Sequence, residues 1–311
     1  MTTTSADAPY LDPTRRHDFV LLFDANDSNP NGDPDAGNLP RIDPETNQGL
    51  VTDTAIKRKV RNYVALYERG LAEDDPVRER LKIYVEVGVA LNERHRRAFS
   101  ALGKKGSKAA DPEARAWMCD NFFDVRMFGA VMSTGDFNCG QVRGPVQLAI
   151  GRSVGPVFQQ ELAITRVAVT KEEELKKLLE GDGGKDREMG RKAIVPYGLY
   201  VTEGTYSPML GARDGRRSDG TGVDTNDLAL FWEALNRMWD QDRSAAWGRM
   251  ACRGLHVFSH TNPLGDAPRH RLVERVSILA KHSPARSFAD YTVEVAGDGV
   301  PDGISYHNLT E

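Results

Sequence analysis

The sequence HDFVLLFDANDSNPNGDPDAGNLPRIDPETNQGLVTDTAIKRKVRNYV spans His17 to Val64 and contains the features that decide the fold. Its first part, His17–Asp24, is a dense apolar run between polar flanks, which predicts a buried strand. The next part, Ala25–Gly49, is rich in Asn, Pro, Gly and Asp, residues that favour turns. A loop of this length without periodicity is longer than an ordinary connection, and we expect it to carry function.

The end of this stretch predicts an amphipathic helix that Thr52 or Asp53 caps and Gly70 ends. Its apolar residues follow helical spacing, namely Ile56, Val60, Tyr63, Val64 and Tyr67. Lys57 and Arg61 stand one turn apart on the same flank. Most such basic flanks are simply solvated, but the long Gly-rich loop directly before this one favours a binding role.

Further along, the chain alternates between strand and helix patterns. We expect strands at Ile83–Leu91, Val125–Met132, Phe137–Ser153, Leu162–Val169, Lys192–Val201, Gly198–Tyr206 and Gly254–Ser259. Helices are expected at Asp111–Phe123 and Asp224–Asp242. Without insertions the order is strand, helix, strand or strands, helix, strand. That order is the βαββαβ pattern of the ferredoxin-like or RRM fold, so the predicted fold class is α+β.

Residues 1–16 are interpreted as a flexible polar leader and residues 17–311 as a single domain with two insertions. One insertion, at about 81–117, is strongly basic: between Leu81 and Lys108 it carries seven Lys or Arg residues against two Glu residues. We expect it to be mobile. The other, at about 162–195, is charged and glycine-broken, and we expect an arm that projects from the body.

Composition excludes several classes of protein. Hydrophobic residues make up 40% and charged residues 28% of the chain, which is ordinary for a globular domain. No run reaches the roughly 18 apolar residues of a membrane helix, and the leader lacks an apolar signal core, so we expect no membrane partner and a cytoplasmic location. The cysteines Cys119, Cys139 and Cys252 are isolated, so neither a disulfide framework nor a zinc site is predicted. The net charge of −4 conceals separate basic and acidic segments.

The aspartates of the long loop are the strongest candidates for a metal site. Asp27-x-Asn29-x-Asn31-Gly32 matches the opening of an EF-hand loop, but Asn38 stands where that loop requires Glu. A nuclease metal could also be held by four neighbouring carboxylates, Asp24, Asp27, Asp33 and Asp35. Because all four belong to one local loop, whereas two-metal chemistry needs carboxylates from rigid elements, we predict no metal, no cofactor and no catalytic residue.

Five separate motifs resemble the Cas-seven (Cas7) family of backbone subunits from type I CRISPR surveillance complexes, with the type I-C branch most similar. They are PNGDPDAGNLPRIDPETNQGLVTDTAIKRKVRNYV (30–64), GQVRGPVQLAIGRS (140–153), GRKAIVPYGLYV (190–201), DRSAAWG (242–248) and GLHVFSHTNPLGDAP (254–268). They follow the family's order and cover nearly the whole chain after the leader.

The resemblance implies a modified RRM-like palm, with finger-like insertions that include residues 81–117 and a thumb hairpin at 162–195. It implies a non-catalytic subunit of Cascade that polymerises head to tail along a CRISPR RNA (crRNA). Implied partners are that RNA, the target DNA strand, further copies of the chain, the small end-cap subunit that holds the crRNA 5′ handle, and the large subunit. The implied RNA-binding residues are Arg41, Thr54, Lys57, Arg58, Arg61, Gln141, Arg143, Gly144, Arg152, Arg166, Met189 and Lys192.

This role agrees with simple physics, because a scaffold that accepts any guide must grip phosphates rather than read bases. Two alternatives stay open at the level of sequence. One is a metal-dependent endoribonuclease of the type III backbone kind, for which Asp33 is the nearest candidate. The other is a free-standing RRM-like regulator, which is disfavoured because no RNP-type aromatic signature lies on a predicted strand.

Overall fold

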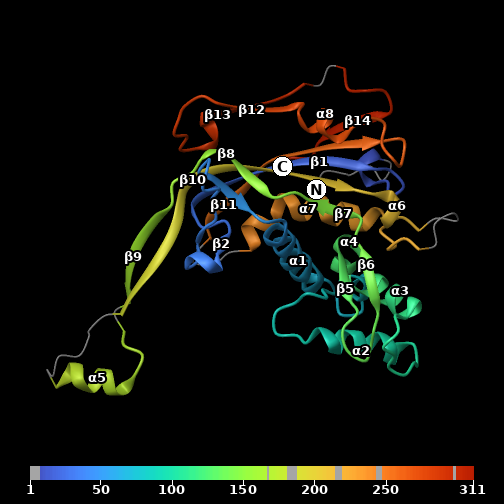
Figure 1. Cartoon of the computed structure of the whole chain (residues 1–311), viewed down its shortest axis with the longest axis horizontal. Helices are drawn as coiled ribbons and strands as arrows, with labels where there is room; N and C mark the ends of the chain where they lie inside the picture. The colour runs from blue at the N-terminus through green and yellow to red at the C-terminus, as the bar shows by residue number, and fades with distance from the viewer. Residues whose placement is uncertain (1–7, 167, 181–187, 214–218, 243–246, 297–298) are drawn as a thin grey trace.

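The computed structural model describes residues 8–311 except 167, 181–187, 214–218, 243–246 and 297–298. An eight-stranded sheet forms the centre of the body (Figure 1). Its spatial order is β14 (Ile304–Asn308), β11 (Trp247–His260), β1 (His17–Ser28), β10 (Glu188–Tyr206), β8 (Gly151–Pro156) and β4 (Gln48–Val51), with β7 (Val146–Leu148) and β9 (Gln160–Arg166) also paired to β10. Every pairing among these strands is antiparallel. The fold is therefore mixed α and β around a central antiparallel sheet.

Strand β1 is buried on both faces, which explains its unbroken apolar run. Phe19, Leu21 and Phe23 point to one face, where α1 (Asp53–Gly70) and α7 (Thr225–Gln241) cover the sheet. Val20 and Leu22 point to the other face, which is covered by α8 (Arg269–Val273) and by the hairpin of β12 (Val276–Ala280) and β13 (Tyr291–Val295). The alternation follows from the two-residue period of a strand.

The predicted helix α1 is confirmed, because its N-cap is Thr52 and its last residue is Gly70. The predicted helix at Asp224–Asp242 is confirmed as α7, which Asp224 caps through a hydrogen bond from the Asp227 backbone N–H. The predicted segments Lys192–Val201 and Gly198–Tyr206 form parts of one strand, β10, which also includes the base of the arm.

The basic insertion is a folded lobe rather than the mobile segment we expected. Residues 81–117 contain α2 (Leu91–Ala101) and α3 (Pro112–Asn121), and the lobe continues beyond the predicted insertion with α4 (Phe123–Phe128), β5 (Gly129–Met132) and β6 (Gly140–Arg143). A second hydrophobic core holds it together, with Tyr84, Phe99, Met118, Phe122 and Cys139 among its buried members. We call this lobe, residues 81–143, the finger; it lies beside α1 and α7 in Figure 1.

Two predicted strands in the finger are wrong, for different reasons. Ile83–Leu91 is not a strand, because the backbone N–H groups of Tyr84 and Val85 donate to the Asp124 carboxylate, at 2.8 and 3.0 Å, instead of to a neighbouring strand. The strand predicted at Val125–Met132 begins only at Gly129, since the residues before it form α4. All six residues of α4 are buried, and periodicity cannot separate a short buried helix from a strand.

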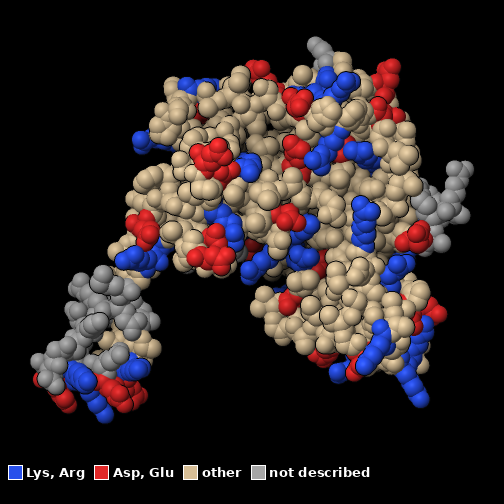
Figure 2. Space-filling model, in the orientation of Figure 1, with Lys and Arg blue, Asp and Glu red and all other residues tan. Residues whose placement is uncertain are grey.

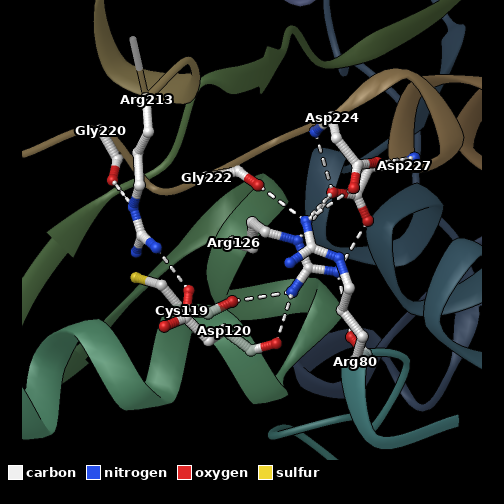
Figure 3. Close-up of polar contacts among 9 residues, drawn as sticks. All are labelled: Arg80, Cys119, Asp120, Arg126, Arg213, Gly220, Gly222, Asp224 and Asp227. Atoms are coloured by element: carbon white, nitrogen blue, oxygen red, sulfur yellow. Dashed lines mark hydrogen bonds and ion pairs between the residues drawn. The ribbon is translucent and has the colours of Figure 1, made fainter. Parts of the chain in front are cut away.

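A buried ionic cluster joins the finger to helix α7 of the body (Figure 3). Arg126 is fully buried and donates two hydrogen bonds to the Asp227 carboxylate, at 2.7 and 2.8 Å. A third guanidinium hydrogen bond, at 2.7 Å, reaches the Cys119 carbonyl. Arg80 adds ion pairs to Asp227 and Asp224, at 2.9 and 3.1 Å. Although burial alone would raise it, these guanidinium groups lower the pKa of Asp227, so the carboxylate stays charged.

The arm is a long two-stranded ribbon that leaves the sheet. Strands β9 and β10 pair from Gln160↔Ile194 to Arg166↔Glu188, and α5 (Glu172–Leu179) follows β9 at the far end. Figure 1 shows α5 well away from both the sheet and the finger. The remaining elements are the short helix α6 (Pro208–Gly211), the loop strands β2 (Gly32–Asp33) and β3 (Leu39–Pro40), and the 3₁₀ helices η1 (Pro9–Leu11), η2 (Pro34–Ala36), η3 (Pro76–Arg80) and η4 (Phe288–Asp290).

Residues 8–16, which we expected to be part of a flexible leader, pack against the body. Leu11 is buried in the core under α7. Three side chains donate to carbonyls of this segment: Trp232 to Tyr10 at 2.9 Å, His17 to Asp12 at 3.0 Å, and Tyr206 to Pro13 at 2.9 Å. We call this arrangement the N-terminal clasp. Within the described part of the chain, no helix is long and apolar enough to span a bilayer.

Candidate nucleic-acid interface

The long loop is folded onto the start of α1. The Asn31 side-chain oxygen accepts a hydrogen bond from the Thr52 backbone N–H at 2.9 Å, and the Thr52 hydroxyl accepts from Ala55 N–H at 3.3 Å. The Leu50 N–H donates to the Arg41 carbonyl at 2.8 Å, which fixes Arg41 near the same helix end. The loop and the helix N-terminus thus form one surface.

Arg152 reaches this surface from the neighbouring strand. In the register of β8 and β4, Arg152 lies opposite Leu50, two residues before the cap of α1. Its guanidinium pairs with Asp43 at 2.8 Å and lowers the pKa of that carboxyl. The Arg152 side chain remains exposed, so the contact with Asp43 is a surface ion pair of little strength. Arg41 similarly pairs with Asp33 at 3.3 Å.

The basic side chains of α1 differ in their exposure and in whether an acidic side chain already pairs with them. Lys57 pairs with Asp53 at 2.9 Å, and Arg61 pairs with the buried Asp124 at 2.8 Å, with only 13% of the Arg61 side chain exposed. Arg58, by contrast, is exposed and makes no ion pair among the described residues, and Thr54 is exposed at the first turn. Arg58 is therefore the cation of α1 that is most available to a phosphate.

The segment Gln141–Gly144 meets α1 through Phe128. The Lys57 ammonium and the Arg61 guanidinium lie 5.8 and 5.4 Å from the centre of the Phe128 ring. In the hairpin of β5 and β6, Arg143 lies opposite Gly129, the residue after Phe128. Gln141 and Arg143 are both exposed, and within the described ranges Arg143 has no ion pair.

Gly144 is explained by internal packing rather than by the approach of a ligand. A Cβ atom at this position would lie 2.0 Å from the carbonyl carbon of Phe128 and 2.3 Å from the nitrogen of Gly129. The backbone of Gly144 therefore presses against its own fold. Its carbonyl also accepts a hydrogen bond from the Gln147 side chain at 3.0 Å.

The predicted arm residues lie apart from this group. Lys192 lines a hollow of about 480 Å³ between the base of the arm and the loop, together with Asn38, Leu39 and Ile164. Arg191 also lines it and is almost fully exposed; sequence reasoning missed this residue, because a strand pattern alone does not say which of Arg191 and Lys192 faces outward. The backbones of Arg166 and Met189 lie in β9 and β10, but their side chains are outside the described part.

The surface around α1 carries mixed charge. Figure 2 shows basic and acidic side chains interspersed over the middle of the drawn face. The loop carboxylates do not converge on a metal site: Asp24 is buried against Arg253 at 2.8 Å, and Asp33 caps η2 by accepting from the Asp35 N–H. The described residues contain no group of three or more His, Cys, Asp or Glu side chains placed to hold a metal ion.

Comparison with known proteins identifies the family to which the sequence is similar. The family model for CRISPR-associated protein Cas7 matches residues 15–296. A CRISPR-associated protein Cas7 from Haloferax volcanii is 26% identical over 245 residues, which cover 71% of this chain and 64% of that relative's length. This chain thus matches slightly less than two thirds of the relative.

Two solved structures show weaker similarity. A chain of a CRISPR RNA-guided surveillance complex, pre-nicking, gives a TM-score of 0.44 at 17% identity, covering 81% of this chain and 79% of that one. A chain of another CRISPR RNA-guided surveillance complex gives 0.43 at 16%, covering 81% and 71%. Similarity at this level carries no argument about function.

Proposed function

The chain belongs to the family of CRISPR-associated protein Cas7, and from that premise we propose that it is a non-catalytic RNA-binding subunit of a CRISPR surveillance complex. In this proposal, copies polymerise head to tail along a CRISPR RNA and present it for pairing with target DNA. The complex is a Cascade of type I-C, in the cytoplasm. The other partners are the end-cap subunit that holds the 5′ handle and the large subunit.

The strand order supports an RRM-like palm. Along the chain, the elements β1, α1, β8, β10, α7 and β11 follow one another as βαββαβ, with the finger and the arm as insertions. In the sheet, the four strands lie in the order β11, β1, β10, β8. This arrangement is the one that places two helices on one face of an antiparallel sheet, as α1 and α7 are placed here. In this proposal the arm is the thumb.

One observation carries the RNA-binding proposal. Exposed arginines that have no ion pair within the described part of the chain lie beside the start of α1, to which the folded loop is hydrogen-bonded. Among the described residues Arg58 and Arg143 have no ion pair. Arg152 holds an exposed, weak pair that a phosphate can replace, and Arg41 holds a half-buried pair with Asp33 at 3.3 Å. Guanidinium groups bind phosphate in a bidentate manner without reading bases. Lys57 and Arg61 contribute less charge, because Asp53 and Asp124 already offset them.

The test is the salt dependence of RNA binding by the double variant Arg58→Ala with Arg143→Ala. Each lost phosphate contact should reduce the slope of log affinity against log salt concentration by about 0.7 for a single strand, so two should reduce it by about 1.4. The loss should be equal for RNAs of unrelated sequence, measured by fluorescence anisotropy. Arg237→Ala, an exposed arginine of α7 paired with Glu311, is the control and should leave the slope unchanged. A loss confined to some sequences, or an unchanged slope, would refute the proposal.

A further inference from the structure

An aromatic side chain projects into solvent next to the long loop. Phe158 lies in the segment between β8 and β9 and is 72% exposed. Of the Phe and Trp side chains whose surroundings the structure describes, it is the only one that is exposed. A single exposed apolar residue needs no explanation by itself, so the surroundings of this ring decide whether it has a role.

The chain on both sides of Phe158 is fixed to the long loop. The backbone N–H of Val157 donates to the Asn47 carbonyl at 2.9 Å, and the side chain of Gln159 donates to the Pro40 carbonyl. The ring is therefore carried by a segment that is anchored at both neighbouring residues. A ligand that stacks on such a preorganised ring loses little free energy in ordering the protein.

The same loop holds a guanidinium group of the proposed RNA surface. Arg152 pairs with the Asp43 carboxylate at 2.8 Å, and the Asp43 carbonyl accepts from the Asn47 N–H, also at 2.8 Å. Asn47 is in turn the residue to which the neighbour of Phe158 is hydrogen-bonded. The turn 43–47 thus connects the exposed ring to the exposed arginine through a short series of hydrogen bonds.

The chemistry around the ring favours a nucleobase over an apolar protein surface. Within residues 43–48 and 156–160, all of which the structure describes, Phe158 is the only large apolar side chain that is exposed. A hydrophobic protein contact needs a patch of such side chains, whereas one base needs only one ring. The turn also carries the carboxylates of Asp43 and Glu45, so charge adds little binding energy here and stacking can add more.

We propose that Phe158 is a stacking platform for a nucleobase of the bound RNA, and that Arg152 holds a phosphate beside that base once the phosphate replaces Asp43. The inference rests on the proposed function and adds a residue to it. Stacking uses the π-face that every base has, so the contact suits a scaffold that accepts any guide sequence. Unlike the phosphate contacts, it supplies binding energy that salt does not screen.

The first test is the affinity of Phe158→Ala for a short single-stranded RNA that holds one copy, measured by fluorescence anisotropy. We expect binding to weaken by about 5- to 100-fold, the loss that removal of one base–aromatic stack produces. The slope of log affinity against log salt concentration should not change, because no cation is removed. The exposed position predicts an unchanged melting temperature, which circular dichroism checks.

Substitutions at the same position separate stacking from a simple apolar contact. Phe158→Trp should bind the short RNA at least as tightly as the parent, whereas Phe158→Leu should bind like Phe158→Ala although it keeps an apolar side chain. The control is Leu264→Ala, which alters a 70% exposed side chain in the loop between β11 and α8 and should leave affinity unchanged. Parent affinity in either Phe158→Ala or Phe158→Leu overturns the inference.

The second test removes the bases instead of the ring. A strand of the same length whose sugars carry no bases offers the same phosphates without a π-face, so the parent and Phe158→Ala should bind it equally. Such non-additivity between base and ring isolates their direct contact. If Phe158→Ala loses as much affinity for the abasic strand as for RNA, the ring acts through the fold of the protein and the inference is wrong.

The outcomes also separate this inference from the proposed function. If the parent shows no salt-dependent binding of RNA, both fall together. If the parent binds RNA and Arg58→Ala with Arg143→Ala lowers the salt slope while Phe158→Ala binds normally, only the stacking falls.

Two further results would assign Phe158 to another partner and overturn the stacking on RNA. One is normal binding of the short RNA by Phe158→Ala with shorter arrays on a long RNA, measured by mass photometry, which would place the ring between copies. The other is a loss seen with single-stranded DNA of the same length but not with RNA.

Discussion

Arg126 shows what a single residue contributes to the attachment of the finger. The chain buries this guanidinium completely and satisfies it with Asp227 and with backbone carbonyls (Figure 3). No sequence pattern predicted this contact, because Arg126 lies in an apolar run that we interpreted as a strand. Its partner lies 101 residues away, and no local pattern connects them.

Replacing Arg126 by Met should therefore destabilise the protein strongly. The change leaves the Asp227 carboxylate buried without its main partner, which costs about 3–5 kcal/mol for such pairs. The free energy of unfolding, measured by urea denaturation, reports the loss. Arg237→Met removes an exposed ion pair with Glu311 and should cost less than about 1 kcal/mol. Equal losses in the two variants would contradict the role of the buried cluster.

The candidate RNA-binding residues were partly predictable at this scale. The helical spacing of Lys57 and Arg61 correctly places them on one flank of α1 beside the loop. Their ion-pair partners were less predictable. Asp53 lies near Lys57 in the sequence, but Asp124, the partner of Arg61, is 63 residues distant and belongs to the finger. Sequence distance therefore hid the fact that Arg61 is held by Asp124, whereas Arg58 makes no ion pair with any residue that the structure describes. Their binding of RNA remains a prediction.

At the scale of elements, strong periodicity was a reliable guide and short apolar runs were not. The helices α1 and α7 were predicted because their apolar periodicity is long and a capping residue precedes each. The strand β1 was predicted because its apolar run is dense and lies between polar flanks. Ile83–Leu91 failed because a carboxylate, Asp124, takes up its backbone donors. The folded core of the finger was missed because its basic surface dominates the sequence, while its apolar residues are spread over some 60 positions.

The hairpin of β5 and β6 depends on close contact of two glycine backbones. Gly144→Ala should destabilise the protein by about 1–3 kcal/mol, because the added methyl group would overlap Phe128 and Gly129. Gly155→Ala is the matched control, since nothing lies within 4 Å of its added Cβ. Thermal unfolding followed by circular dichroism measures both. A Gly144→Ala protein as stable as the control would show that the hairpin relaxes freely.

At the scale of the whole molecule, the structure shows strands and helices mixed around a central antiparallel sheet, as the predicted α+β class implies, and the βαββαβ palm stays a proposal. What the sequence left open was the position of the finger and the arm in space. The finger is fixed by ionic contacts to α7, whereas the arm extends away. Such placements depend on contacts between distant segments, which a single sequence does not encode locally.

Stability of the whole molecule should fall on mild acidification. Burial lowers the pKa of His17 and of His256 to about 4, below the ordinary value of 6.5. The unfolded chain then binds more protons between these values, so stability is lost as pH falls from about 6.5 towards 4. Each histidine should contribute about 2 kcal/mol of loss between pH 7 and 4.5. Melting temperature against pH measures it, and His17→Gln should flatten the profile; an unchanged profile would contradict this origin.

The N-terminal clasp has a practical consequence for anyone who alters the gene. A reporter or affinity tag fused ahead of Ala8 would be held beside α7. The reason is that Trp232, His17 and Tyr206 form hydrogen bonds with the segment that begins at Ala8. A truncated protein starting at Arg15 would lack the three carbonyl groups that accept these hydrogen bonds. Each buried donor left without an acceptor should cost about 1–3 kcal/mol of stability. Trimming this end for crystallisation should therefore stop at residue 7.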